Sequence, residues 1–344
     1  MKKFLLVFVG VLTLTFNAKA QNSDGFEAIL LAAGDAEKLT QAYINPAMTG
    51  LIYGMNSGWY HTAKTHKLFG FDISIGLNAS IVPSKDEIFR FANLGLSSNI
   101  TAAAPTGATV GGPNNLQTAV TFNGTVQGQN VSATFDMPGG VKDDLPLNAV
   151  PTPAVQFSMG LPWKMDAMIR LVPEVGDDDV KGKLLGIGLK KEITSWFGPM
   201  EKTPLHVSLL AAYTSMTVDY DIQADSSIPG SGQRAEFDLN SYTVEAIASL
   251  NFPFINIFGG IGYSSGNSDL RMLGRYDLEY NTGFPPPNDT VTETVVDPLN
   301  LGFDASGFKT TVGARISLGF FKIFGSYTLQ EYNTLNAGIA LSFR

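Results

Sequence analysis

The last ten residues of the chain alternate between apolar and small or polar side chains, and this period of two recurs along most of the sequence. Successive side chains on a β-strand point to opposite faces of the sheet, so such a segment has one apolar and one polar face. The same alternation runs through residues 69–80 and 308–320. The chain is therefore expected to consist mainly of amphipathic strands. At the C-terminus the apolar set is Leu335, Ala337, Ile339, Leu341 and Phe343.

Two architectures fit these strands: a β-sandwich with its apolar face inward, and a transmembrane β-barrel with its apolar face toward lipid. Three features favour the barrel. The strands run roughly 10–14 residues, against a usual strand length of about 5–6 residues. Their polar faces are rich in Gly, Ser, Thr and Asn, which suits a lumen. Aromatic residues such as Trp59, Trp163 and Trp196 gather at strand ends, as in the interfacial girdles of outer-membrane barrels.

Composition excludes several classes of protein. Charged residues make up 16 % of the 344 residues and aromatic residues 11 %, which argues against a disordered chain. The net charge of −8 argues against nucleic-acid binding, which requires a basic surface. Because there is no cysteine, disulfides, zinc–thiolate sites and a thiol nucleophile are excluded.

The first twenty residues have the pattern of a secretory signal. Lys2 and Lys3 precede an apolar run from Phe4 to Phe16, and Ala18-Lys19-Ala20 matches an A-x-A cleavage site. The run is too short for a spanning helix, which needs about 20 residues. We expect cleavage after Ala20 and export to the outer membrane of a bacterial cell.

Strand-like segments predict the size of the barrel. Twelve are clear, and residues 116–124 and 129–136 either add a pair, giving about fourteen strands, or form a hairpin in a large outer loop. The predicted fold is thus an all-β, antiparallel transmembrane barrel of about 14 strands, with 12 as the alternative. Besides the three segments above, strands are expected at 52–61, 88–98, 152–161, 164–173, 182–193, 205–219, 238–252, 254–265 and 322–331.

Connection lengths predict the orientation. Short connections, such as those at Pro162-Trp163 and Pro253, mostly alternate with long or acidic ones near 99–150, 220–237 and 266–306. Bacterial barrels have short periplasmic turns and long outer loops. The last strand then ends in the periplasm at Phe343, where a terminal aromatic residue resembles the signal that the barrel-assembly machinery reads.

The segment before the first strand differs from the rest. Residues 26–44 have helical composition, and Asn45-Pro46 is expected to end the helix because a residue before proline avoids the helical region. Such a helix must lie in the periplasm or in the lumen, where it would act as a plug. We therefore divide the chain into a signal peptide (1–20), an N-terminal helix or plug segment (21–49) and a barrel (50–344).

Several motifs carry a family resemblance. Asn45, Pro46 and Ala47, after a helix and before the first strand, resemble the plug region of FadL-type uptake channels, and Ile44 to Gly50 is more distantly similar to PorP/SprF barrels. The longer stretch from Gly54 to Asp72, with Gly160-Leu161-Pro162, resembles an uncharacterised family of Bacteroidota outer-membrane barrels. The resemblance implies a FadL-like barrel of fourteen strands with an N-terminal plug, and it implies no particular cargo.

Charged residues on the presumed inward faces are the candidate transport residues. They either shape a permeation path or form an ion-pair network that holds plug and barrel together, since interior charges are usually paired. Asp166 and Arg170 share a strand face about 13 Å apart, at ~3.3 Å per residue, so we expect each to pair with a neighbour. The set comprises Asp72, Arg90, Asp166, Arg170, Lys190, Glu245, Lys309 and Arg315.

Catalytic and metal chemistry have little support in the sequence. His206 and Ser208 share a strand face, but no nucleophile motif surrounds them, and His61 and His66 flank a predicted tight turn. The acidic run at residues 177–179 suits a solvated loop better than a calcium site. No enzymatic activity, cofactor or metal is expected.

We expect a plugged channel for passive uptake of small molecules, hydrophobic ones included, with the segment around Asn45, Pro46 and Ala47 as its gate. The alternative is a non-conducting structural or partner-binding barrel of an outer-membrane complex, whose lumen is closed by fixed ion pairs. Expected partners are outer-membrane lipid, the barrel-assembly machinery, a small-molecule cargo and, for the alternative, a protein at the outer loops.

Overall fold

A closed antiparallel β-barrel dominates the computed structural model, which describes residues 26–176, 180–222 and 228–343. The expected signal peptide and the acidic run 177–179 lie outside the described residues. Within them, consecutive strands pair in order and β1 pairs with β16, which closes the ring. The strands of the ring are β1 (Phe71–Ile81), β7 (Ala149–Leu161), β8 (Met165–Gly176), β9 (Val180–Glu192), β10 (Leu205–Asp221), β11 (Gly230–Asn251), β12 (Ile255–Asn281), β14 (Leu299–Leu318), β15 (Phe321–Leu329) and β16 (Thr334–Phe343).

The described part of the sheet has the expected fourteen strands, but only ten of them close the ring. The other four, β3 (Ile100–Ala102), β5 (Thr118–Val126), β6 (Gln129–Met137) and β13 (Thr290–Val296), extend the sheet beyond one end of the barrel. The pair β5–β6 is therefore a hairpin in the long connection between β1 and β7 rather than a pair of ring strands. The all-β antiparallel barrel is confirmed, and its bore is that of a ten-stranded ring.

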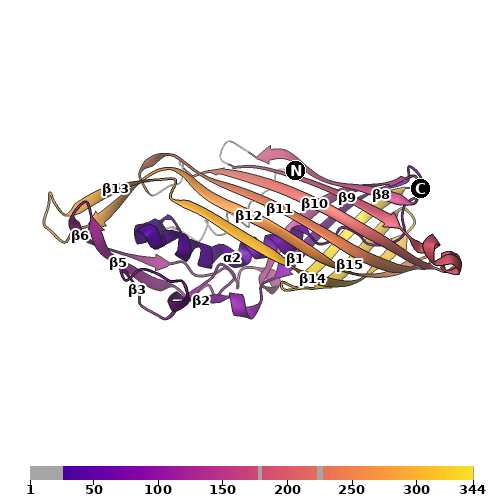
Figure 1. The fold of residues 1–344 in the computed structure, drawn as a ribbon, viewed down its shortest axis with the longest axis horizontal. Helices are drawn as coiled ribbons and strands as arrows, with labels where there is room; N and C mark the ends of the chain where they lie inside the picture. Colours follow the sequence, from indigo (N-terminus) through magenta and orange to yellow (C-terminus); the bar gives the residue numbers. More distant parts are fainter. Residues whose placement is uncertain (1–25, 177–179, 223–227, 344) are drawn as a thin grey trace.

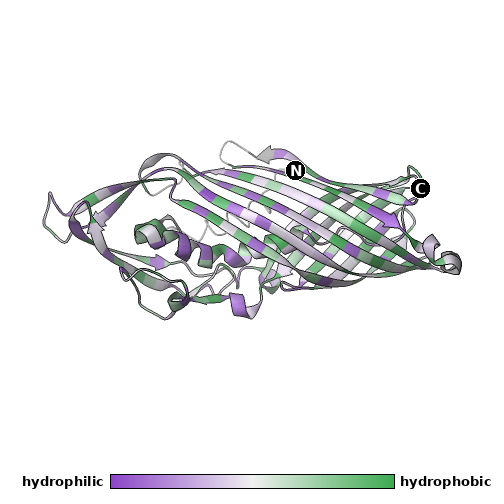
Figure 2. Cartoon of the chain, viewed as in Figure 1, coloured by the Kyte–Doolittle hydropathy of each residue, from purple (hydrophilic) through white to green (hydrophobic). Residues whose placement is uncertain are grey.

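Alternation of side chains places the strand faces as expected. On β1, Ile73, Ile75 and Leu77 are exposed on the outer surface, whereas Asp72 and Asn78 are buried in the lumen. Figure 2 shows this alternation as hydrophobic and hydrophilic bands along the strands. The outer surface of the ring is thus apolar, and the lumen holds the polar side chains.

Residues 82–148 form a cap at the end of the barrel with the long connections. It contains the short pair β2 (Ile88–Arg90) and β4 (Thr106–Ala108), the β5–β6 hairpin and the 3₁₀ turns η2 (Ser84–Asp86), η3 (Phe91–Asn93) and η4 (Pro146–Asn148). The expected barrel strand at 88–98 is wrong, because only Ile88–Arg90 is extended there and it pairs within the cap.

The N-terminal segment is longer than expected. It begins with the 3₁₀ turn η1 (Phe26–Asp35) and continues as helix α2 (Ala36–Met55), which runs through Pro46. The expected helix end at Asn45-Pro46 and the expected strand at 52–61 are therefore wrong. Residues 46–55 are buried among barrel and cap residues, and tertiary packing outweighs the local preference that proline imposes.

An irregular segment, residues 56–70, connects α2 to β1; we name it the lumenal linker. It runs from the helix toward the end of the barrel where the connections are short, at 162–164, 252–254 and 319–320. The η5 turn (Thr194–Lys202) and the end of β16 lie at this same end. No helix among the described residues is long and apolar enough to cross a membrane.

Candidate functional site: the lumen and its plug

Backbone carbonyls of the lumenal linker are bound by side chains from the barrel wall. Gln156 donates to the carbonyl of Trp59 at 3.1 Å, and Lys190 donates to those of Thr62 (3.3 Å) and Lys64 (3.1 Å). A buried backbone group without a partner is costly, and an irregular segment cannot bond to itself as a helix does. The polar lumen therefore replaces water as the hydrogen-bonding partner of the linker.

Side chains from three strands of the barrel cap the C-terminal end of α2. Arg170 on β8 donates to the carbonyls of Met55 (3.1 Å) and Ser57 (3.0 Å), and Lys309 on β14 donates to that of Asn56 (2.8 Å). Asn78 on β1 donates to the carbonyl of Gly54 at 3.0 Å. The last carbonyls of a helix have no partner within it and carry partial negative charge, so cations stabilise them.

Trp59 fixes the part of the linker that directly follows helix α2. It is fully buried, and the guanidinium carbon of Arg170 lies 3.9 Å from its ring centroid. Gly186 and Gly188 on β9 face this ring, and a Cβ at either would lie 3.0–3.1 Å from its atoms. The two glycines thus leave the space that the indole fills.

Lys309 also forms a buried ion pair with Glu245 at 2.7 Å. The other carboxylate oxygen of Glu245 accepts a hydrogen bond from the hydroxyl of Tyr60 at 3.2 Å. A buried charge needs both an opposite charge and hydrogen bonds. Here β11, β14 and the linker supply them together.

A second cluster lies nearer the end with short turns, around His61 and His66. Both ring nitrogens of His66 contact carboxylates, Nδ1 that of Asp166 (3.1 Å) and Nε2 that of Asp72 (3.2 Å), so this geometry requires a proton on each nitrogen. Nε2 of His61 lies 3.1 Å from Asp72, while Nδ1 of His61 lies 2.9 Å from a guanidinium nitrogen of Arg315. Because arginine only donates, His61 accepts through Nδ1 and donates through Nε2.

Asp166 is shared between His66 and Lys190, whose ammonium lies 2.9 Å away. Glu192, at the end of β9, accepts from the backbone and hydroxyl of Thr65 and contacts His206 at 2.9 Å. Every carboxylate of this region thus binds both a wall residue and the linker, or the linker twice.

The structure brings together most of the lumen residues predicted from sequence. Asp166 pairs with Lys190 and Glu245 with Lys309, while Asp72 and Arg315 meet through His61. Arg170 binds carbonyls and Gln156 rather than the neighbouring carboxylate that we expected. These contacts match the predicted alternative of an ion-pair network that holds plug and barrel together.

Arg90 is not a lumen residue; it is exposed on β2 in the cap. Asn45, Pro46 and Ala47 lie in the middle of α2, with Asn45 exposed and the other two buried. The sequence reasoning missed His61 and His66 as lumen residues because it placed them in a turn between two strands. Their short spacing to Asp72, across residues 62–68 that lack the alternation of a strand, was the available signal.

No group of three or more His, Asp or Glu side chains among the described residues is arranged to hold a metal ion. His206 contacts Glu192, and Ser208 donates to the carbonyl of Ala63, so both take part in holding the linker. That the chain is not an enzyme stays a prediction.

The model of a family of unknown function, DUF6588, matches residues 1–343. The chain belongs to this family. DUF6588 covers nearly the whole chain, so plug, linker and barrel are all parts of one family pattern. No curated protein sequence matches the chain.

Solved structures similar to this DUF6588 chain include several outer-membrane proteins. Ail from Yersinia pestis has 8 % identity and a TM-score of 0.27, with 80 % of this chain and all of Ail covered. The translocator domain of the autotransporter NalP from Neisseria meningitidis has 10 % identity and a TM-score of 0.26, covering 81 % and 90 %. The outer membrane protease OmpT from Escherichia coli has 10 % identity and a TM-score of 0.27, covering 82 % and 100 %.

Proposed function

We propose that this protein is an outer-membrane barrel whose lumen is closed by its own N-terminal segment, and that it acts through binding at its capped end rather than as a freely conducting channel. The apolar outer surface of the ring and the polar lumen support a lipid environment. The short turns lie at the end of the barrel opposite the cap and support a periplasmic position for it. The cap would then lie on the outer side of the membrane.

The single observation that carries the closed state is the way the linker is bound. Arg170, Lys309 and Lys190 each donate to at least one linker or helix-end carbonyl, and Asp72, Asp166 and Glu192 each bind linker side chains. A hydrogen bond to a charged group contributes about 1.5–3 kcal/mol. Displacing the linker breaks many such bonds at once, and this cost opposes opening of the lumen.

Planar-bilayer recording of the purified protein tests this proposal. We expect no stable conductance from the intact chain. We also expect none after deletion of residues 26–43, because the lumenal linker still fills the lumen at the end with the short turns. Deletion of residues 26–66 should open the ring to ions. Conductance from the intact chain would overturn the closed barrel, and an unchanged silence after the longer deletion would show that wall side chains alone close the lumen.

A second candidate, ligand-dependent uptake, has one specific observation in its favour. A cavity of about 390 Å³ lies along α2 beside Asn45 and Pro46, on the side facing the cap. A molecule bound there would touch the helix that plugs the barrel. A channel of this kind would conduct only when its cargo is present, which the same recording distinguishes.

A further inference from the structure

Strand β14 has an unpaired edge toward the capped end of the barrel. It pairs with β12 along residues 299–316, but β15 pairs with it only from Thr310 onward. No other strand in the described part of the chain pairs with residues 299–309. Successive residues of a strand direct their backbone groups to opposite edges. The groups that point away from β12 along this edge belong to residues 300, 302, 304, 306 and 308.

Helix α2 lies beside this edge and provides substitutes for a missing strand. Three of its side chains bond to backbone groups of β14, whereas the N–H and C=O groups of Asp304, midway along the edge, have no partner among the described residues. Exposed helix side chains bonded in this way exchange readily with other partners. The three bonds join Glu37 to the amide of Asn300 (3.3 Å), Gln41 to the carbonyl of Gly302 (3.0 Å) and Tyr53 to the carbonyl of Ser306 (3.3 Å).

The edge lies in water rather than in lipid. The outward side chains of Asn300, Asp304 and Ser306 are polar and exposed. The apolar outward series of β14 begins only at Phe308, which is 85 % exposed, and continues toward the short turns with Val312. An unpaired strand edge in water presents a row of donors and acceptors to which another strand can add.

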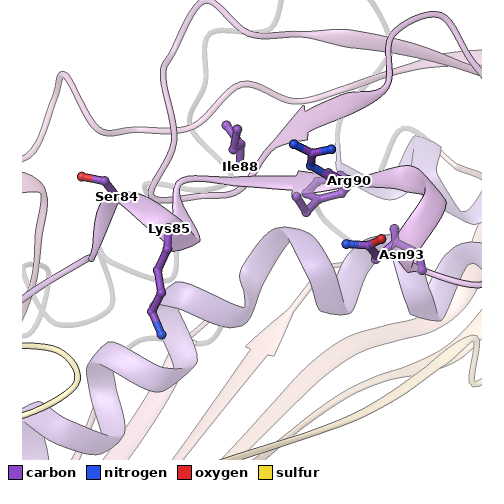
Figure 3. A pocket seen from close by; sticks show the side chains of 7 residues that line it. Ser84, Lys85, Ile88, Arg90 and Asn93 are labelled. Atoms are coloured by element: carbon purple, nitrogen blue, oxygen red, sulfur yellow. The ribbon is translucent and has the colours of Figure 1, made fainter.

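A cavity of about 390 Å³ adjoins the edge, between α2 and the cap. Gln41 connects the two features, because it lines the cavity and also donates to the carbonyl of Gly302. The cap wall of the cavity contains the apolar residues Ile88, Phe89 and Leu94. Figure 3 shows this wall, with the side chain of Lys85 extending from the cap toward α2. The volume is within the usual range of binding pockets, about 300–1,000 Å³.

We infer that the β14 edge and this cavity together bind an extended peptide segment of a partner protein, which adds a strand to the sheet. Its backbone pairs with residues 300–308, and alternate side chains face opposite sides of the sheet. An apolar side chain on the inner side enters the cavity. On the outer side, the exposed carboxylate of Asp304 makes no ion pair among the described residues and favours Lys or Arg.

This inference rests on the proposed binding at the capped end and names the chemistry of the partner. The probe is a heptapeptide of alternating lysine and valine, titrated calorimetrically into the full chain in zwitterionic nanodiscs, with empty nanodiscs subtracted. Two further peptides have the same side chains and N-methyl groups on either the lysines or the valines. Only alternate N–H groups of an added strand face β14. We therefore expect one methylated peptide to bind like the parent and the other to bind about tenfold more weakly or worse.

Variants of the edge and the cavity test the two parts of the site. S306P removes an N–H that points away from β12, so it leaves the ladder with β12 intact and should weaken binding about tenfold. S306A retains this N–H and should bind the peptide like the wild type. A42F places a large side chain in the cavity and should weaken binding several-fold.

Equal affinity of the two methylated peptides, or unchanged affinity in S306P, would overturn the site. A dimer of the full chain that sedimentation detects and S306P dissociates would also overturn it, because a second copy would then occupy the edge. Circular dichroism of each variant checks that the barrel is intact. Failure of peptide binding leaves the closed barrel standing, whereas conductance of the intact chain would overturn the closed barrel and not this site.

Discussion

Arg170 illustrates why a narrow lumen contains fixed charges. Its three nitrogens donate to Gln156 and to the carbonyls of Met55 and Ser57, and its guanidinium lies over the ring of Trp59. A lysine has the charge but lacks the planar fork that reaches several acceptors at once. The charge of an inward residue could be predicted from strand alternation, but its partners could not, since they belong to an irregular segment with no period of its own.

Replacement of Arg170 by Ala should lower the free energy of unfolding by about 3 kcal/mol, because helix-end carbonyls and Gln156 lose charged or buried partners. Urea unfolding followed by tryptophan fluorescence measures the change. R234A is the matched control, since Arg234 pairs with Glu236 on the surface and such pairs contribute about 0–1 kcal/mol. Equal losses in the two variants would contradict the capping role.

Asp35, just before α2, ties the helix to the cap. Its carboxylate accepts from the backbone and hydroxyl of Ser97 and from Lys38. Burial alone would raise the pKa of Asp35, but these hydrogen bonds outweigh burial and lower the pKa below its usual 3.8. A depressed carboxyl pKa contributes stability above about pH 3.8, and this contribution is lost as the pH falls through the folded-state value.

Replacement of Asp35 by Asn should therefore weaken the attachment of the cap by about 1–3 kcal/mol at pH 7, and the difference from the wild type should shrink as the pH falls below about 3.8. Limited digestion of the cap by trypsin at neutral pH and by pepsin at acid pH reports the attachment. A difference that stays constant down to the lowest pH at which the barrel remains folded would show that the charge of Asp35 is not the cause.

In helix α2, tertiary packing overrides a local conformational preference of the sequence. Proline disfavours a helical residue before it, yet α2 continues through Pro46 because residues 46–55 are buried against strands and cap. The same residues had enough apolar character to suggest a strand at 52–61. The strands of the ring could be predicted because lipid and lumen impose a period of two. Residues 46–55 of the plug are buried in protein on all sides and have no such signature.

Close packing of α2 depends on glycine. A Cβ at Gly50 would lie 2.5 Å from Cγ2 of Val150, and one at Gly54 would overlap Thr152. Replacement of Gly50 by Val should push the helix from β7 and cost about 1–3 kcal/mol, as overpacking usually does. We expect an added protease to cleave the lumenal linker faster in this variant than in the wild type, and the cleavage rate measures the displacement. G34A, where a Cβ meets nothing within 4 Å, should behave as the wild type.

At the scale of the whole molecule, the ring has ten strands because two of the twelve clearly predicted strands lie outside it. The other ten predictions correspond to the ring, whereas residues 52–61 belong to the plug helix and the lumenal linker and residues 88–98 belong to the cap. A ring of ten is only slightly wider than the eight-stranded barrels whose interiors are filled by side chains. A helix and a linker fill most of such a bore, which is why closure by a covalently attached segment is stable here.

A disulfide between linker and wall tests whether that closure ever opens. The hydroxyls of Thr62 and Ser249 are 3.3 Å apart, and the chain has no cysteine of its own. The double variant T62C/S249C should oxidise readily, and the closed barrel predicts that oxidised and reduced forms are equally silent in bilayers at every voltage. Thr134→Cys with Thr121→Cys, a pair within the cap hairpin at 2.9 Å between hydroxyls, controls for oxidation itself. Conductance that appears only in the reduced lumen variant would mean that the linker moves, and the barrel would then be an uptake channel whose gate is the segment between α2 and β1.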